Sequence, residues 1–168
     1  VAALLSAGAN VDETVPNSGL TPLMIAATGG YVEVTELLLN MSANTDAVDS
    51  NGTTALHQAV KNKFGLGVVK TLLAHGTNPN ARINNPNAVD ANQSSYGGAK
   101  APTGVSLQGA TPLLLAAGSN HLDMVKLLLE AGADPLIPTE QNVTTLMMSA
   151  GAGTGLNSSD AETAEEIE

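Results

Sequence analysis

The sequence contains no cysteine and no tryptophan, and its aromatic residues are limited to one phenylalanine and two tyrosines. Without cysteine there can be no disulfide, no Cys-ligated zinc site and no thiol chemistry, and both cytoplasmic and extracytoplasmic locations stay compatible. A hydrophobic core must therefore be built from aliphatic side chains and methionine. No run approaches the roughly 18 apolar residues typical of a membrane-spanning helix, so we expect no membrane insertion.

Basic residues are also scarce. Lysine and arginine together number 6 against 16 acids, which gives a formal charge of −10. Nucleic-acid binding requires a basic stripe that displaces phosphate counterions, and six scattered bases do not form one. We therefore expect no nucleic-acid partner, and a neutral or basic protein surface fits the charge better.

The sequence does contain an internal repeat, in a chain of 168 residues that is 43% hydrophobic and long enough for one folded domain. Four similar segments begin at Gly19, Gly52, Gly109 and Asn142, at spacings of 33, 57 and 33 residues. A recurring period of this length is typical of stacked repeat proteins. The segment Thr21-Pro22-Leu23 and its counterparts predict a short helix, because threonine caps a helix and proline is tolerated at the first helical position.

A second block follows the first three segments. Val34–Leu39, Val69–Ala74 and Val125–Glu130 carry apolar residues at helical spacing, and they lead into Ser42-Ala43-Asn44, Gly76-Thr77-Asn78 and Gly132-Ala133-Asp134. The spacing predicts a longer second helix that a glycine closes. The segment 1–10 has the same pattern, cut off at its front. Neither helix can bury its apolar face alone, whereas stacked helix pairs can.

These motifs, Gly-x-Thr-Pro-Leu-x-x-Ala-Ala and Val-x-Leu-Leu-Leu-x-x-Gly-Ala-Asp, resemble ankyrin repeats, here with long insertions of the kind expected in bacterial members. The resemblance implies an all-α solenoid of stacked helix–turn–helix units with one long inter-repeat finger loop. Some units depart from the pattern. Ala55 and Thr145 replace the proline, Asn142 replaces the glycine, and Gly65-Leu66-Gly67 lengthens the inter-helix turn.

The repeats set the expected organisation of a single array, interrupted twice. We predict a partial repeat at 1–12, repeats at 13–45 and 46–82, an insertion at 83–108, a repeat at 109–138, and a partial repeat at 139–168 whose loop spans 151–160. The Gly- and Ser-rich loop is expected to end at a helix cap near Asp160. Because a solenoid needs polar terminal repeats, we expect this chain to continue in a longer array or to adjoin another structure.

The insertion admits two interpretations. It is rich in Asn, Ser, Gly and Pro, which is typical of a mobile spacer between repeats. Alternatively it is a projecting finger in which Tyr96, with Asn85, Gln93 and Lys100, forms part of a contact surface. The sequence does not decide between them.

No residue pattern indicates catalysis, a metal site or a cofactor. His57, His75 and His121 stand at positions where ankyrin-like repeats commonly carry histidine, so structural roles are favoured. There is no His-Glu-x-x-His and no Gly-x-Ser-x-Gly. The glycines of 151–155 lack the spacing and the lysine of a phosphate loop.

The resemblance implies a non-catalytic module that binds a protein partner through turn tips, the exposed face of the first helices and the finger. The matching positions are Asn17, Ser18, Leu20, Thr28, Ser50, Asn51, Thr53, Lys61, Asn62, Tyr96, Gln108, Ser119 and Gln141. Most of these are small and polar and lack the large anchors common in binding hot spots. The alternative is a structural array that packs against other domains or subunits of a larger bacterial assembly.

Overall fold

The computed structural model describes residues 1–62, 65–85 and 107–150, and all regular structure in these ranges is helical. The helices are α1 (Ala2–Ser6), α2 (Pro22–Gly29), α3 (Val32–Asn40), α4 (Ala55–Lys61), α5 (Leu66–Ala74), α6 (Pro112–Gly118), α7 (Leu122–Glu130) and α8 (Thr145–Ser149). This confirms the predicted all-α class. The predicted loop at 151–160 and the helix cap near Asp160 lie outside the described residues.

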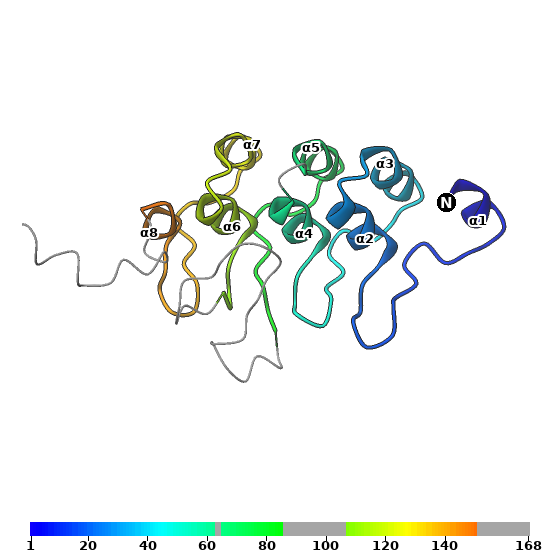
Figure 1. Cartoon of the computed structure of the whole chain (residues 1–168), viewed down its shortest axis with the longest axis horizontal. Helices are drawn as coiled ribbons and strands as arrows, with labels where there is room; N and C mark the ends of the chain where they lie inside the picture. Colours follow the sequence, from blue (N-terminus) through cyan, green and yellow to red (C-terminus); the bar gives the residue numbers. More distant parts are fainter. Residues whose placement is uncertain (63–64, 86–106, 151–168) are drawn as a thin grey trace, which may run out of the picture.

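The helices form two rows (Figure 1). The first helices of successive units, α2, α4, α6 and α8, pack side by side in one row, and the second helices α3, α5 and α7 form the other. Long loops extend from the first-helix row on the side away from the second helices (Figure 1). The pairs α2–α3, α4–α5 and α6–α7 lie within the predicted repeats 13–45, 46–82 and 109–138, whose boundaries remain predictions.

Threonine caps start the first helices, as predicted. The Oγ1 atoms of Thr21, Thr111 and Thr144 accept hydrogen bonds of 3.3 Å from the backbone N–H three residues later. Proline occupies the first turn of α2 and α6. Each cap satisfies a backbone donor that the first turn of a helix would otherwise leave unpaired, and it stabilises the helix by about 1 kcal/mol.

Glycines in the left-handed region end or follow the helices. Gly30 closes α2 at φ 71°, and Gly76 and Gly132 follow α5 and α7 at φ 79° and 88°. Ser42 takes the corresponding place after α3 at φ 63°. A residue with a Cβ atom is strained in this region, so the α3 terminus stores a small penalty that the other units avoid.

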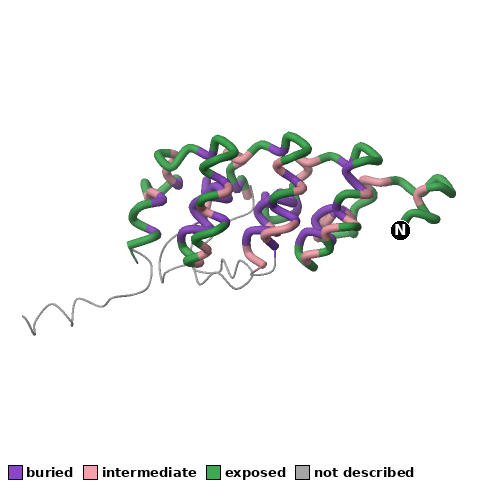
Figure 2. The backbone as a smooth tube through the Cα atoms, turned by 90° about the horizontal axis from the view of Figure 1, so that it is seen from above, coloured by how far each residue is buried: buried purple, intermediate pink, exposed green. Residues whose placement is uncertain are grey.

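The core runs along the array between the two rows. Figure 2 shows the buried segments concentrated inside the stack, with the exposed ones at turns and ends. Leu23, Leu56 and Leu113 are fully buried at equivalent positions of three first helices. Each such leucine stabilises the fold by about 2 kcal/mol relative to an exposed one. The neighbouring alanines, such as Ala59 and Ala116, are also fully buried and let adjacent helices approach closely.

Polar side chains between units fix the spacing of the repeats. Asp12 accepts a hydrogen bond from the backbone N–H of Asn44 at 2.9 Å, and Asn80 accepts one from Asp134 at 2.8 Å. The two acceptors occupy equivalent positions, each just after a second helix. The same kind of bond thus links the predicted partial repeat 1–12 to the repeat 13–45, and the repeat 46–82 to the repeat 109–138.

Candidate functional site

Four loops beneath the first-helix row have hairpin-like bases. A backbone N–H at the start of each loop donates to a carbonyl at its end, from Val15 to Leu20, Asp49 to Thr53, Ile83 to Ala110, and Thr139 to Val143 (2.9–3.0 Å). We call the described residues enclosed by these pairs the tips. They are 16–19, 50–52, 84–85 with 107–109, and 140–142.

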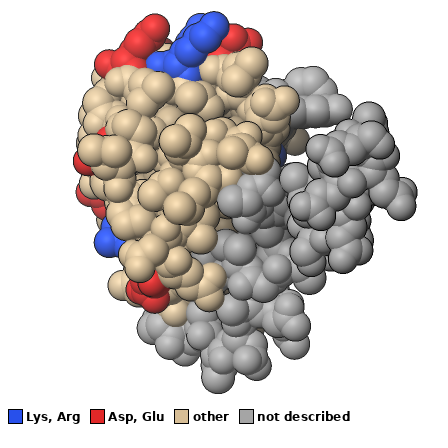
Figure 3. Space-filling model, turned by 90° about the vertical axis from the view of Figure 1, so that its left-hand side faces the viewer, with Lys and Arg blue, Asp and Glu red and all other residues tan. Residues whose placement is uncertain are grey.

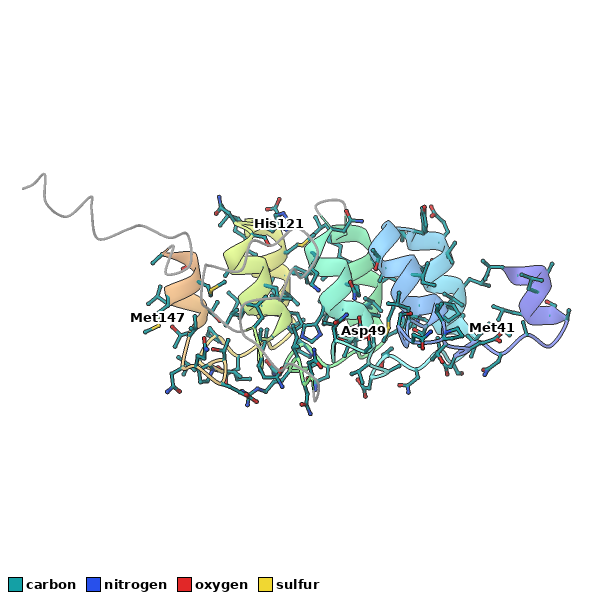
Figure 4. The ribbon with its side chains drawn as sticks, turned by 60° about the horizontal axis from the view of Figure 1, so that its bottom comes forward. Met41, Asp49, His121 and Met147 are labelled. Atoms are coloured by element: carbon teal, nitrogen blue, oxygen red, sulfur yellow. The ribbon has the colours of Figure 1, made fainter. Side chains whose placement is uncertain are left out.

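A buried carboxylate organises the second tip. Asp49 is 7% exposed, and its Oδ1 accepts hydrogen bonds of 2.9 Å from the backbone N–H groups of Asn51 and Thr53. Its Oδ2 accepts from Nε2 of Gln58 at 3.1 Å. Figure 4 places Asp49 among the tip loops, and His121 at the opposite side of the helices. The carboxylate is engaged in holding the turn, as buried charges must be to offset their desolvation.

Backbone hydrogen bonds join neighbouring tips into one ridge. Ser50 N–H donates to the carbonyl of Ser18 at 2.8 Å, Asn84 N–H to Gly52 at 3.3 Å, and Glu140 N–H to Gln108 at 3.0 Å. The tips approach so closely at Gly52, at φ 72°, that a Cβ atom there would overlap the carbonyl of Asn84. The tip ridge therefore presents its polar groups at fixed spacing.

The predicted insertion begins at Ile83, at the base of the third tip, and ends within that tip at Gln108. Ile83 N–H donates to Ala110, and Gly109 N–H donates to Ile83 at 2.8 Å. Beyond this pair, Asn85 N–H donates to Oε1 of Gln108 at 3.1 Å. The predicted insertion bounds remain a prediction, and residues 86–106, including Tyr96, Gln93 and Lys100, lie outside the described residues.

Arg82 ties the third tip to the segment just before the fourth. Its Nε donates to the carbonyl of Gly109 at 3.2 Å, and its Nη2 donates to the carbonyl of Pro138 at 3.1 Å. One guanidinium thus bridges two units through its fixed set of donors.

The first helices add a second part to the surface. Thr28 and Ile25 are exposed on α2, and Nδ2 of Asn62 at the end of α4 donates to the carbonyl of Thr28 at 2.8 Å. Lys61 is half-buried. Burial lowers the pKa of its ammonium group, and the negative charge of Asp49 opposes that effect.

Most predicted contact residues lie at the surface, with one exception. Exposed residues are Asn17, Thr28, Ser50, Asn51 and Gln141, and partly buried ones are Ser18, Leu20, Lys61, Asn62, Gln108 and Ser119. The prediction for Thr53 is wrong, because its side chain is fully buried. Its Oγ1 accepts a hydrogen bond of 2.8 Å from Gln58, so it serves the turn and not a partner.

The exposed residues that the sequence prediction did not include are more numerous, and Ile25 and Tyr31 are two of them. Ile25 is 47% exposed on α2, and Tyr31 is 59% exposed in the turn between α2 and α3. The pattern of the repeat gives no sign that Ile25 faces solvent, since its counterpart Leu115 is buried. Tyr31 is a bulky residue beside two glycines, which is a signal that could have been used.

His57 has the structural role that was favoured for it. Its Nδ1 accepts a hydrogen bond from the backbone N–H of Thr54 at 3.2 Å, which places the ring proton on Nε2, 3.3 Å from the carbonyl of Ala110. Burial lowers the pKa of His57 from 6.5 to about 4, with the Lys61 charge also lowering it and hydrogen bonds to backbone carbonyls opposing. The neutral ring thus connects α4 to the base of the third tip.

The described residues contain no group of three or more His, Cys, Asp or Glu side chains placed to hold a metal ion. Within the same ranges, no helix combines the length and hydropathy needed to cross a membrane.

Two family models match the chain, both of ankyrin repeats. One describes three ankyrin copies and covers residues 1–83, and the other describes a single ankyrin repeat and covers residues 108–140. The chain belongs to the ankyrin-repeat family. Ankyrin repeats are in general non-catalytic scaffolds, and this array is a protein–protein interaction module.

Curated relatives contain ankyrin-like segments within longer chains. The array is 34% identical to B-cell lymphoma 3 protein homolog of Mus musculus, a match that covers 83% of this chain and 26% of that protein. It is 34% identical to ankyrin repeat and KH domain-containing protein mask-1 of Caenorhabditis elegans, over 86% of this chain and 5% of that protein. A putative ankyrin repeat protein of Rickettsia bellii (strain RML369-C) is 46% identical over 34% of this chain and 24% of that protein. The chain thus spans about a quarter or less of these relatives.

Proposed function

We propose that this array is a non-catalytic module that binds a protein partner along the tip ridge and the adjacent face of the first helices. The observation that carries the proposal is the set of tip-to-tip hydrogen bonds. They hold Ser18, Gly52 and Gln108 in register with the following tips. A rigid surface loses little conformational entropy on binding, which favours recognition of a folded or extended protein segment.

The chemistry of the ridge favours hydrogen bonding over bulk charge. Asn17, Ser50, Asn51 and Gln141 offer hydroxyl and amide groups at solvent-exposed positions. Figure 3 views the array from the α8 end. On this end face, which is not the tip ridge, charged side chains lie at the edges and most of the described surface is uncharged. The exposed hydroxyl and amide groups of the ridge suit a partner that supplies complementary polar groups.

The test places two bulky changes on exposed tips and compares them with the same changes elsewhere. Ser50→Tyr with Gln141→Lys alters tips two and four, where Ser50 contributes only its backbone to the described contacts. The matched control, Asn40→Tyr with Ala74→Lys, introduces the same side chains on exposed positions of α3 and α5. Equal thermal unfolding of the two variants would establish that both keep the fold.

The measurement is retention of co-purified proteins by each immobilised variant, quantified by mass spectrometry. We expect the tip variant to lose its specific partner by about tenfold in affinity, equivalent to roughly 1.4 kcal/mol, and the control to retain it. Equal retention by the two variants would refute the tip ridge as the binding face. Loss in the control alone would favour a structural array that packs through its second helices.

A further inference from the structure

Tyr31 is an aromatic side chain at the surface of the array. It lies in the turn between α2 and α3, is 59% exposed, and is the only aromatic residue among the described ranges. Its ring lies directly against Gly29, where a Cβ atom would overlap Cε2 and Cδ2 of the ring. Because Gly29 has no side chain, the ring rests on the backbone and much of it stays open to solvent.

The surroundings of Tyr31 form a mixed apolar and polar patch. Ile25, Thr28 and Gly29 are exposed at i, i+3 and i+4 on α2, so they share one face of that helix. The hydrogen bond from Asn62 to the carbonyl of Thr28 brings the end of α4 to the same place. We call Ile25, Thr28, Gly29, Tyr31 and Asn62 the Tyr31 patch.

Negative charge adjoins this patch. Glu33 and Glu36 are exposed on α3, two and five residues after Tyr31. Lys61 is the residue before Asn62 and is half-buried, so the exposed charges that follow Tyr31 on α3 are negative. The whole chain, with 16 acids and 6 bases, attracts cations over longer range.

We infer that the Tyr31 patch binds a basic side chain of the protein partner, arginine in particular, stacked on the exposed ring and paired with Glu33. This deepens the proposed function and rests on it. A guanidinium on a tyrosine ring gains electrostatic attraction and keeps its donors free for a carboxylate. Tyrosine is also among the residues enriched in interface hot spots. The partner would thus contact the array on both the tip ridge and this opposite rim of the first helices.

A selection experiment tests the chemistry and does not require the partner to be identified first. Random twelve-residue peptides displayed on phage would be selected on the whole chain and, in parallel, on Tyr31→Ala. We expect arginine and lysine to be enriched in the first pool relative to the second. A pool enriched in acidic residues, identical pools, or no binding peptide at all would overturn the inference.

The strongest peptide then serves as a fluorescent probe in direct titrations. Tyr31→Ala should weaken its binding about tenfold, Glu33→Gln about threefold, and Tyr31→Phe by less than twofold because the ring face remains. Val48→Ala, which shortens another exposed apolar side chain, is the matched control and should bind like the parent.

The two proposals fail in different ways. If the tip variant loses the co-purified partner and Tyr31→Ala still binds the peptide fully, the Tyr31 proposal is refuted and the tip-ridge proposal is supported. If the tip variant retains that partner and Tyr31→Ala loses peptide binding, the Tyr31 proposal is supported and the tip-ridge proposal is refuted.

Discussion

Acidification should destabilise the array through His57, well above the pH at which most carboxylates are protonated. The ring is fully buried, its Nδ1 accepts from Thr54, and its Nε2 faces the carbonyl of Ala110. A second ring proton would remove the acceptor that Thr54 uses and would place a charge in the core. The folded state therefore holds His57 neutral.

The direction and size of the change in the free energy of unfolding follow from two pKa values of His57, 6.5 for the ordinary group and about 4 in the folded chain. Below pH 6.5 the unfolded chain takes up a proton that the folded chain rejects, so the free energy of unfolding falls as the pH falls. The stabilisation is complete above pH 6.5. Linkage gives a loss of about 2 kcal/mol at pH 5 and about 3 kcal/mol once both states are protonated below pH 4.

Urea denaturation between pH 8 and pH 5 measures this loss. His57→Gln keeps a polar side chain without the titrating ring, and its free energy of unfolding should fall about 2 kcal/mol less than that of the parent over this range. His75→Gln, at an exposed histidine, is the matched control and should follow the parent. Parallel curves for the parent and His57→Gln would refute the reasoning. So would an NMR titration of the His57 ring with a midpoint near the ordinary value of 6.5, a measurement that does not require the variant to fold.

Two further predictions concern backbone positions. Gly52→Ala should lower the free energy of unfolding by at least about 2 kcal/mol, because the new Cβ overlaps the carbonyl of Asn84 and because alanine is strained at this positive φ. Gly76→Ala has the same strain but open space around the new Cβ, so it should lower the free energy of unfolding by only about 1 kcal/mol. Chemical denaturation of both variants checks this, and equal losses would contradict the close approach of the tips. Ser42→Gly should stabilise the chain by about 0.5 kcal/mol, since relief of strain at φ 63° exceeds the added entropy of the unfolded glycine; a lower melting temperature would contradict it.

The helices could be predicted because their signals are local and recur in phase. The start of a first helix is marked by a threonine hydroxyl that accepts a hydrogen bond from a backbone N–H three residues later. This cap has the same geometry in three of the four first helices, at Thr21, Thr111 and Thr144. Stacking of such units follows from their apolar faces. The helical array was therefore accessible from sequence.

Side-chain direction within the tips was not accessible in the same way. Thr53 directly follows the second tip, but Gln58 donates a hydrogen bond to its hydroxyl and Asp49 accepts one from its backbone N–H, so its side chain is buried. That outcome depends on contacts made by residues four and five positions away. Tyr31 was overlooked for a related reason, because its exposure depends on Gly29 leaving room for the ring.

The closed base of the third tip uncouples the length of the insertion from the architecture. The chain leaves and re-enters through Ile83 and Gly109, which are hydrogen-bonded at 2.8 Å whatever lies between them. Doubling the length of such a loop adds only about 0.6 kcal/mol of closure entropy. Evolution or an engineer can therefore exchange the segment between Asn85 and Leu107 for another of different size and sequence, while the buried Leu107 and the neighbouring repeats keep their places.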